Sequence, residues 1–329
     1  MKKDWGDLRI MWLVFALGSA VFGGLTAVLS KIGIRDVDAS VATAIRTAVV
    51  LIFSWFMVLL TGGFKTIGAI SGSSLCFLVL SGLATGASWL FYFRALQLGD
   101  VNKVAPIDKS SVVLTMLLAC LILGEDLGGL KVFCMILIGA GTWMMIQRKE
   151  GEPEGREGSR WLIAALLSAV FASLTSILGK IGIEGVESNL GTALRTCVVF
   201  LMAWLMVFLR GSQYSLKKLQ GRCWLFLILS GFATGGSWLC YYRALQEGPA
   251  SIVAPIDKLS ILVTIFFSRL LLRERLTKTS LYGLALLTAG TFLLLLSPLA
   301  RYWHVNFLNK FTTCWLKLTS PSNMLYVLC

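Results

Sequence analysis

An aspartate and a lysine stand side by side in an otherwise apolar segment, and the same segment occurs twice. Val104-Ala105-Pro106-Ile107-Asp108-Lys109 returns letter for letter, 149 residues later, as Val253-Ala254-Pro255-Ile256-Asp257-Lys258. A charged side chain inside a membrane costs several kcal/mol unless it is paired or wetted, so such residues are typical of solute and ion pathways. The chemistry that this pair predicts is the binding or gating of a charged solute.

Other ionisable side chains keep the same separation of 149 residues. The candidates for the substrate pathway or its gates are Lys31, Arg46, Arg94, Asp108 and Lys109 in the first half and Lys180, Arg195, Arg243, Asp257 and Lys258 in the second. We expect one charge cluster near each face of the membrane. Each sums to about +3, which favours an anionic or zwitterionic solute. Two alternatives remain: the aspartates lock helices together as ion pairs, or Lys31 and Arg94 snorkel from helix ends.

The composition predicts an integral membrane protein. The chain is 57% hydrophobic and 14% charged, with a mean hydropathy of +0.79, whereas soluble domains are about 25% charged. Five apolar stretches per half are about 20 residues long, enough to cross the hydrocarbon core as helices. In the first half they lie near residues 10–31, 39–61, 74–98, 104–124 and 128–147, and the second set follows by the same shift. Strands are excluded because open sheet edges cannot face lipid. The expected fold is all-α, with ten transmembrane helices.

The repeat predicts how the helices are organised. We assign residues 1–147 to a first five-helix repeat, 148–160 to a charged linker, 161–297 to a second repeat and 298–329 to a tail without a counterpart. An odd number of spans per half makes the second repeat enter the membrane inverted, as in many secondary transporters. The tail is either an interfacial helix or a disordered extension.

Loop charges predict an orientation. Interior loops on the side of the linker carry thirteen Lys and Arg residues, and those on the other side carry two, Lys65 and Lys131. The positive-inside rule then places the linker in the cytoplasm and both termini outside.

Prolines and small residues mark further candidate positions. Pro106 and Pro255 precede the charged pairs; each either interrupts a helix beside a carboxylate, as in transporter binding sites, or occupies the first turn of a helix. Small-residue runs in 80–90 and 229–239 either pack helices closely or also line the pathway. The weaker lining candidates are Thr85, Ser88, Trp89, Thr234, Ser237 and Trp238.

Motifs for other functions are lacking. The sequence has one histidine, His304, which we interpret as incidental. No Ser-His-Asp set is possible with this histidine alone, so we expect no enzyme. Eight cysteines show no paired spacing for a metal, and no phosphate-binding loop is present. We therefore expect no metal and no cofactor. Membrane topology explains the net charge of +13 better than nucleic-acid binding does.

The doubled five-helix unit, the Ala-Pro-Ile-Asp-Lys segments and the endings Leu123-Gly124-Glu125 and Leu272-Arg273-Glu274 resemble the EamA family of the drug/metabolite transporter superfamily. Each half resembles half-size EamA proteins, so the chain looks like a fusion of two. The resemblance implies a carrier in the bacterial plasma membrane whose pathway is formed by the first four helices of each half. It also implies termini in the cytoplasm, against the loop charges.

The function expected from these observations is a secondary transporter of a small polar metabolite, working by alternating access. The alternative is a non-transporting scaffold or partner subunit. The expected partners are the small-molecule substrate, the lipid bilayer and a coupling ion, for which a proton is the candidate. The chain is expected to be a monomer or a homodimer.

Overall fold

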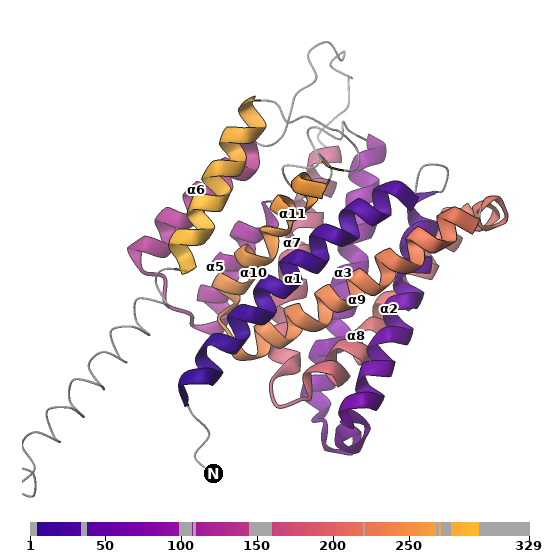
Figure 1. The fold of residues 1–329 in the computed structure, drawn as a ribbon, viewed down its shortest axis with the longest axis horizontal. Helices are drawn as coiled ribbons and strands as arrows, with labels where there is room; N and C mark the ends of the chain where they lie inside the picture. Colours follow the sequence, from indigo (N-terminus) through magenta and orange to yellow (C-terminus); the bar gives the residue numbers. More distant parts are fainter. Residues whose placement is uncertain are drawn as a thin grey trace, which may run out of the picture.

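The computed structural model describes residues 5–33, 38–98, 107, 110–144, 160–219, 221–267, 270 and 278–295 (Figure 1). All regular structure in this part of the chain is helical. The first half contains α1 (Trp5–Gly33), α2 (Ala39–Thr61), the 3₁₀ helix η1 (Gly63–Ala69), α3 (Gly72–Leu98), α5 (Ser111–Leu123) and α6 (Gly129–Met144). The second half contains α7 (Arg160–Ile183), α8 (Ser188–Leu209), η2 (Ser212–Lys218), α9 (Gly221–Glu247), α10 (Ala250–Lys258), α11 (Ser260–Phe267) and a last helix, Lys278–Leu295.

Eight helical regions are long and apolar enough to cross a membrane, with α10 and α11 forming one of them. The other two predicted spans correspond to α5 and α6, which are 13 and 16 residues long within the described residues. Both are shorter than the roughly 20 residues that a span needs. Most of the sequence predicted to extend them lies outside the described residues, as do the linker up to residue 159 and the tail.

Equivalent residues begin and end equivalent helices in the two halves. The carboxylate of Asp38 accepts the N–H groups of Ser40 and Val41 at the start of α2, and that of Glu187 accepts the N–H of Leu190 at the start of α8. These carboxylates satisfy donors that the first helical turn leaves without partners. Gly62, with φ of 73°, caps the end of α2, and the equivalent Gly211, with φ of 65°, follows Arg210, the C-cap of α8. The caps therefore follow the sequence repeat.

Helices of one half pack along helices of the other. α1 lies along α9, α3 along α7 and α2 along α8. In the α1–α9 pair, residue numbers rise in one helix as they fall in the other, from Ser19–Ser237 to Ser30–Ser230, so the helices are antiparallel. By the sequence repeat, α7 is equivalent to α1 and α9 is equivalent to α3. The α1–α9 pair is therefore equivalent to the α3–α7 pair. We call these two contacts the α1–α9 seam and the α3–α7 seam.

Hydroxyl groups join the helices of each seam at equivalent positions. The matched side-chain hydrogen bonds are Ser19–Ser237 (3.3 Å) with Ser88–Ser168 (3.4 Å), and Thr26–Thr234 with Thr85–Thr175 (both 3.3 Å). Inside a membrane such bonds contribute about 0.6–2 kcal/mol each. The seams are thus held by several weak polar contacts.

The small-residue runs of α3 and α9 have two different faces. A Cβ atom on Gly82 would lie 2.7 Å from Cβ of Val198 in α8, and one on Gly231 would lie 2.5 Å from Cβ of Val49 in α2. The glycines therefore allow close packing. The hydroxyl residues of the same helices face the seams instead.

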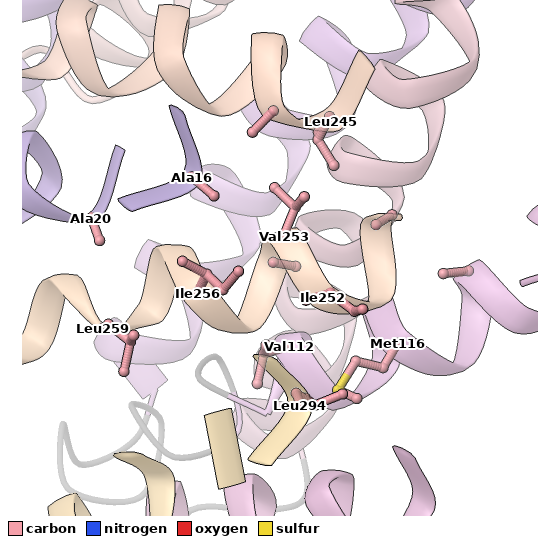
Figure 2. Close-up of a cluster of buried hydrophobic side chains, with 14 of the residues drawn as sticks. Ala16, Ala20, Val112, Met116, Leu245, Ile252, Val253, Ile256, Leu259 and Leu294 are labelled. Atoms are coloured by element: carbon pink, nitrogen blue, oxygen red, sulfur yellow. The ribbon is translucent and has the colours of Figure 1, made fainter. Parts of the chain in front are cut away.

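α10 lies at the centre of a buried apolar cluster that joins the halves. Figure 2 shows Ile252, Val253 and Ile256 of α10 between Ala16 of α1 and Val112 of α5. These side chains are at most 2% exposed. The cluster fixes α10 between two helices of the first half.

α6 and the last helix stand side by side at one end of the molecule (Figure 1). A Cβ atom on Gly141 of α6 would lie 2.5 Å from the backbone N of Leu287 and 2.6 Å from the carbonyl O of Gly283. Backbone atoms of a packed helix cannot move aside as a flexible side chain can. Only glycine fits this contact without separating the helices.

Gly141→Leu is therefore expected to destabilise the protein by about 1–3 kcal/mol or more, the usual cost of overpacking. The measurement is the denaturation midpoint of the purified protein in detergent micelles. Gly129→Leu is the matched control, because a Cβ atom at this position of the same helix meets nothing within 4 Å. Equal midpoints for the two variants would contradict the close contact.

Candidate functional site

Asp257 of α10 lies where α1, α9 and α10 meet. Its Oδ1 accepts a hydrogen bond of 2.6 Å from the hydroxyl of Ser19, which lies 3.3 Å from the hydroxyl of Ser237. Its Oδ2 lies 3.6 Å from Nζ of Lys258, and 23% of the aspartate side chain is exposed. We call Asp257, Lys258, Ser19 and Ser237 the Asp257 cluster. It places a partly accessible carboxylate beside the α1–α9 seam.

The helix is interrupted directly after this carboxylate. α10 ends at Lys258, Leu259 forms a turn and α11 begins at Ser260. Pro255 is the sixth residue of α10, so the first-turn interpretation is wrong for this proline. Proline lacks the N–H that would bond the carbonyl of Ser251, which weakens the helix before the turn. Pro106, Asp108 and Lys109 lie outside the described residues.

Arg195 of α8 is 2% exposed. Its Nε donates to the hydroxyl of Ser81 at 3.0 Å and its Nη2 to that of Thr85 at 2.6 Å. Its Cζ lies 5.0 Å from the ring centre of Trp238 and 4.6 Å from that of Tyr242, within the range of cation–π attraction. Its Nη1 is buried and has no hydrogen-bond partner among the described residues.

Arg46, the equivalent residue of α2, has a different environment. Its side chain is half-buried, and its Nη1 donates to the hydroxyl of Ser30 at 2.8 Å. Ser30 in turn is hydrogen-bonded to Ser230 of α9 at 2.7 Å. Nη1 of Arg46 thus has a hydrogen-bond acceptor, whereas Nη1 of Arg195 has none among the described residues.

The other cations of the second half do not share the Asp257 carboxylate. Lys180 donates to the carbonyl oxygens of Leu245 (2.9 Å) and Gly248, at the C-terminal end of α9 where positive charge is favoured. Arg243 pairs with Glu247 at 2.7 Å. Within the described part of the chain, the five predicted charges are therefore divided among several places. In the first half, Arg94 is exposed in α3, and the side chain of Lys31 in α1 is outside the described residues.

The weaker lining candidates lie mainly in the seams. Thr85 and Trp238 contact Arg195. The hydroxyl of Ser88 donates to the carbonyl of Ser168 (3.0 Å), and that of Ser237 to the carbonyl of Ser19 (3.0 Å). The remaining two are Thr234, which donates to Thr26 across the α1–α9 seam, and Trp89, which packs against the apolar cluster around Val41.

Glu125 and Lys131 form a polar junction that was not predicted. The carboxylate of Glu125, just after α5, accepts the N–H groups of Ala250 (2.6 Å) and Ser251 (3.0 Å) and the hydroxyl of Ser251. Lys131 donates to that hydroxyl at 3.1 Å and is 7% exposed. The interpretation of Lys131 as a loop charge is wrong, because it lies in the first turn of α6. The only sequence signal for this junction is a glutamate after a helix-ending glycine, and it does not name the partner.

No group of three or more potential metal ligands occurs among the described residues. The six cysteines of this part are free thiols within helices, and only Cys134 is fully buried.

Apolar helices of membrane-spanning length, with charged and hydroxyl side chains between them, define a multi-pass membrane protein. The EamA-like transporter family matches residues 10–147 and again residues 159–296. The chain therefore belongs to the EamA-like transporter family and is a transporter of the bacterial membrane, which confirms the resemblance seen in the sequence.

Similar proteins include half-size chains. An uncharacterized transporter in the cobO 3' region of Sinorhizobium sp is 44% identical over 134 residues, which cover 41% of this chain and 95% of the relative. The uncharacterized protein MJ1333.1 of Methanocaldococcus jannaschii is 30% identical over 136 residues, 41% of this chain and 96% of that protein. One crystal structure has a similar fold, with a TM-score of 0.72, 17% identity and coverage of 89% of this chain and 97% of the other.

Proposed function

We propose that this transporter is a secondary carrier that moves a small polar metabolite, anionic or zwitterionic, by alternating access. Its ten spans form two inverted repeats of five. The observation that carries the proposal is the pair of equivalent seams, α1–α9 and α3–α7, each of which joins one half to the other. A carrier needs two gates that open in turn. The two seams are equivalent by the sequence repeat, so they supply two gates built from equivalent helices.

The direction of the helices supports the inverted arrangement. Spans of odd number cross a membrane one way and spans of even number the other. α1 and α9 would be the first and eighth spans, and they are antiparallel, as this alternation requires. α3 and α7 would be the third and sixth, and they are antiparallel as well, with Ser81 bonded to Thr175 and Ser88 to Ser168.

The weakness of the seam contacts supports a moving part. Hydroxyl-to-hydroxyl bonds contribute about 1 kcal/mol each and re-form readily with water once a seam opens. The Asp257 cluster lies beside the α1–α9 seam, and we propose it as the place where a coupling ion, with a proton as the candidate, acts on this seam. By the repeat, Asp108 would serve the other seam.

The test is a counterflow assay with the purified full-length chain in liposomes, against a broad panel of radiolabelled metabolites. Exchange of one solute class, lost when the protein is omitted, is the expected result. If the inserted and folded protein exchanges no solute, a scaffold or partner role replaces the proposal.

The linker between the repeats is expected to be dispensable. Chains cut between Gly151 and Gly158 and expressed together should assemble and retain at least about half of the wild-type exchange rate, because the seams themselves hold the halves together. Half-size relatives, matched over nearly their full length, support this expectation. Expression of each half alone is the control. Loss of exchange by stable, co-purified halves would contradict it.

A further inference from the structure

The N–H groups of Arg195 are only partly used. A guanidinium has five N–H donors. Two of its edges can each bind a carboxylate by donating two parallel hydrogen bonds to it. Ser81 and Thr85, one helical turn apart on α3, occupy the edge formed by Nε and Nη2. The other edge, formed by Nη1 and the second N–H of Nη2, has no hydrogen-bond partner at Nη1 among the described residues.

The charge of Arg195 is likewise unbalanced. No carboxylate of the described residues lies within ion-pair distance of it, and its hydrogen-bond partners are neutral hydroxyl groups. Trp238 and Tyr242 attract the guanidinium through their rings, and neither supplies a hydrogen-bond acceptor to Nη1. A buried polar group without a partner calls for an explanation such as a bound ligand or ion.

Comparison of the two repeats shows how the vacancy arises. Arg46 uses its Nη1 to bond the hydroxyl of Ser30. The residue at the position of Ser30 in the second repeat is Gly179. A Cβ atom on Gly179 would lie 2.6 Å from Cε1 of Tyr242 and 3.1 Å from the hydroxyl of Ser81. The glycine therefore makes room for the Tyr242 ring and at the same time removes the acceptor that the first repeat provides.

We propose that the open edge of Arg195 binds a carboxylate group of the transported solute, with Trp238 and Tyr242 packing against its apolar part. The inference rests on the proposed carrier function and names the substrate class: organic anions or zwitterions with a carboxylate. A planar carboxylate matches the planar Nη1–Nη2 edge with two bonds and neutralises the single charge. A dianionic phosphate would leave negative charge without a partner.

In the present structure the Nη1–Nη2 edge is not accessible from outside, since Arg195 is 2% exposed. Ser81, which holds Arg195 through Nε, also donates to the carbonyl of Thr175 across the α3–α7 seam at 2.7 Å. Opening of this seam would admit a solute to the guanidinium. Carboxylate binding would then favour the open state, since a ligand shifts an equilibrium towards the state that it binds.

The test measures binding of simple carboxylates and of their uncharged amides to the purified full-length protein in detergent. Benzoate with benzamide and propionate with propionamide are the probes, and the readout is the thermal unfolding midpoint against ligand concentration. The carboxylates are expected to raise the midpoint and the amides to leave it unchanged. Arg195→Gln should weaken the apparent carboxylate affinity by about tenfold or more, and Arg195→Lys, which keeps the charge without the planar edge, by a smaller factor.

Arg222→Gln is the control, because Arg222 is exposed at the start of α9 and its removal changes the net charge equally. If Arg195→Gln does not fold, Gly179→Ser with Tyr242→Ala replaces it, and Tyr242→Ala alone is its control. Alanine removes the ring atom that would lie 2.6 Å from a Cβ at Gly179, and the serine offers Nη1 an internal acceptor, as Ser30 does in the first repeat. The double variant should abolish the carboxylate effect while Arg195 remains.

Equal effects of benzoate and benzamide, or a carboxylate effect that survives in both Arg195→Gln and the double variant, would overturn the inference. So would a midpoint raised by inorganic phosphate alone. Counterflow separates the two proposals. Exchange of solutes without carboxylates leaves the carrier function standing and removes this site, whereas carboxylate binding at Arg195 without any exchange leaves the site and removes the carrier function.

Discussion

Asp257→Asn is expected to lower net transport at least about a hundredfold in liposomes while the protein remains folded. Asparagine still accepts the hydrogen bond from Ser19, so the local structure can persist. The charge, however, is lost, and Lys258, 3.6 Å away, is left without its carboxylate. The side chain of Lys258 is 39% exposed, so the lost pair by itself costs about 1 kcal/mol or less. A hundredfold change in rate corresponds to about 2.7 kcal/mol, and we assign the remainder to loss of the gating carboxylate.

The repeat adds a directional expectation to this variant. Asp108→Asn alters the equivalent position of the first half, so the two variants should bias the carrier towards opposite faces of the membrane. Cys240 is a native reporter, because its Sγ lies 3.5 Å from a Cβ placed on Gly18 in the α1–α9 seam. With Cys240 as the only cysteine, labelling by an impermeant thiol reagent should increase from opposite sides in the two variants.

Glu184→Gln is the control for charge, since Glu184 is exposed in the turn after α7. Wild-type transport by Asp257→Asn, or increased labelling from the same side in both variants, would disprove the two-gate mechanism.

Glu125→Ala is expected to destabilise the protein by about 3 kcal/mol. The carboxylate satisfies two backbone N–H groups at the start of α10, those of Ala250 and Ser251, and both residues are 0% exposed. Leaving buried donors without an acceptor costs about 1–3 kcal/mol for each group. Lys131 would also lose a nearby negative charge.

The same change should loosen α10, which carries Asp257. In the described part of the chain, Glu125 is the residue of the loop after α5 whose hydrogen bonds hold the start of α10. We therefore expect Glu125→Ala to reduce transport as well as the denaturation midpoint in detergent. Glu125→Gln, which retains one acceptor oxygen, should be intermediate.

Asp126→Ala is the matched control, because Asp126 is the neighbouring carboxylate and is exposed. A similar loss of stability in both variants would show that general negative charge, and not the capping of α10, is what this loop contributes.

The sequence by itself determined the parts of this protein that depend on local composition and on repetition. Apolar length predicted the helices, and α2 was located to the residue at 39–61. The shift of 149 residues predicted equivalent elements, and the caps at Asp38 and Glu187 follow it. The Ala-Pro-Ile-Asp-Lys segments pointed to the family that the comparison confirms. The 3₁₀ helices η1 and η2 were not predicted, because seven residues between two spans carry no clear periodicity.

The tertiary structure decided which charges meet. From the sequence, the five ionisable residues of the second half were expected to form one cluster. Helix packing instead directs Lys180 to the end of α9, pairs Arg243 with Glu247 and surrounds Arg195 with hydroxyl groups and rings. The partners Arg195–Ser81 and Glu125–Ser251 are more than 100 residues apart, so no local pattern encodes them. Side-chain directions on packed helices bring such residues together, and these are fixed only when the two halves interlock along their seams.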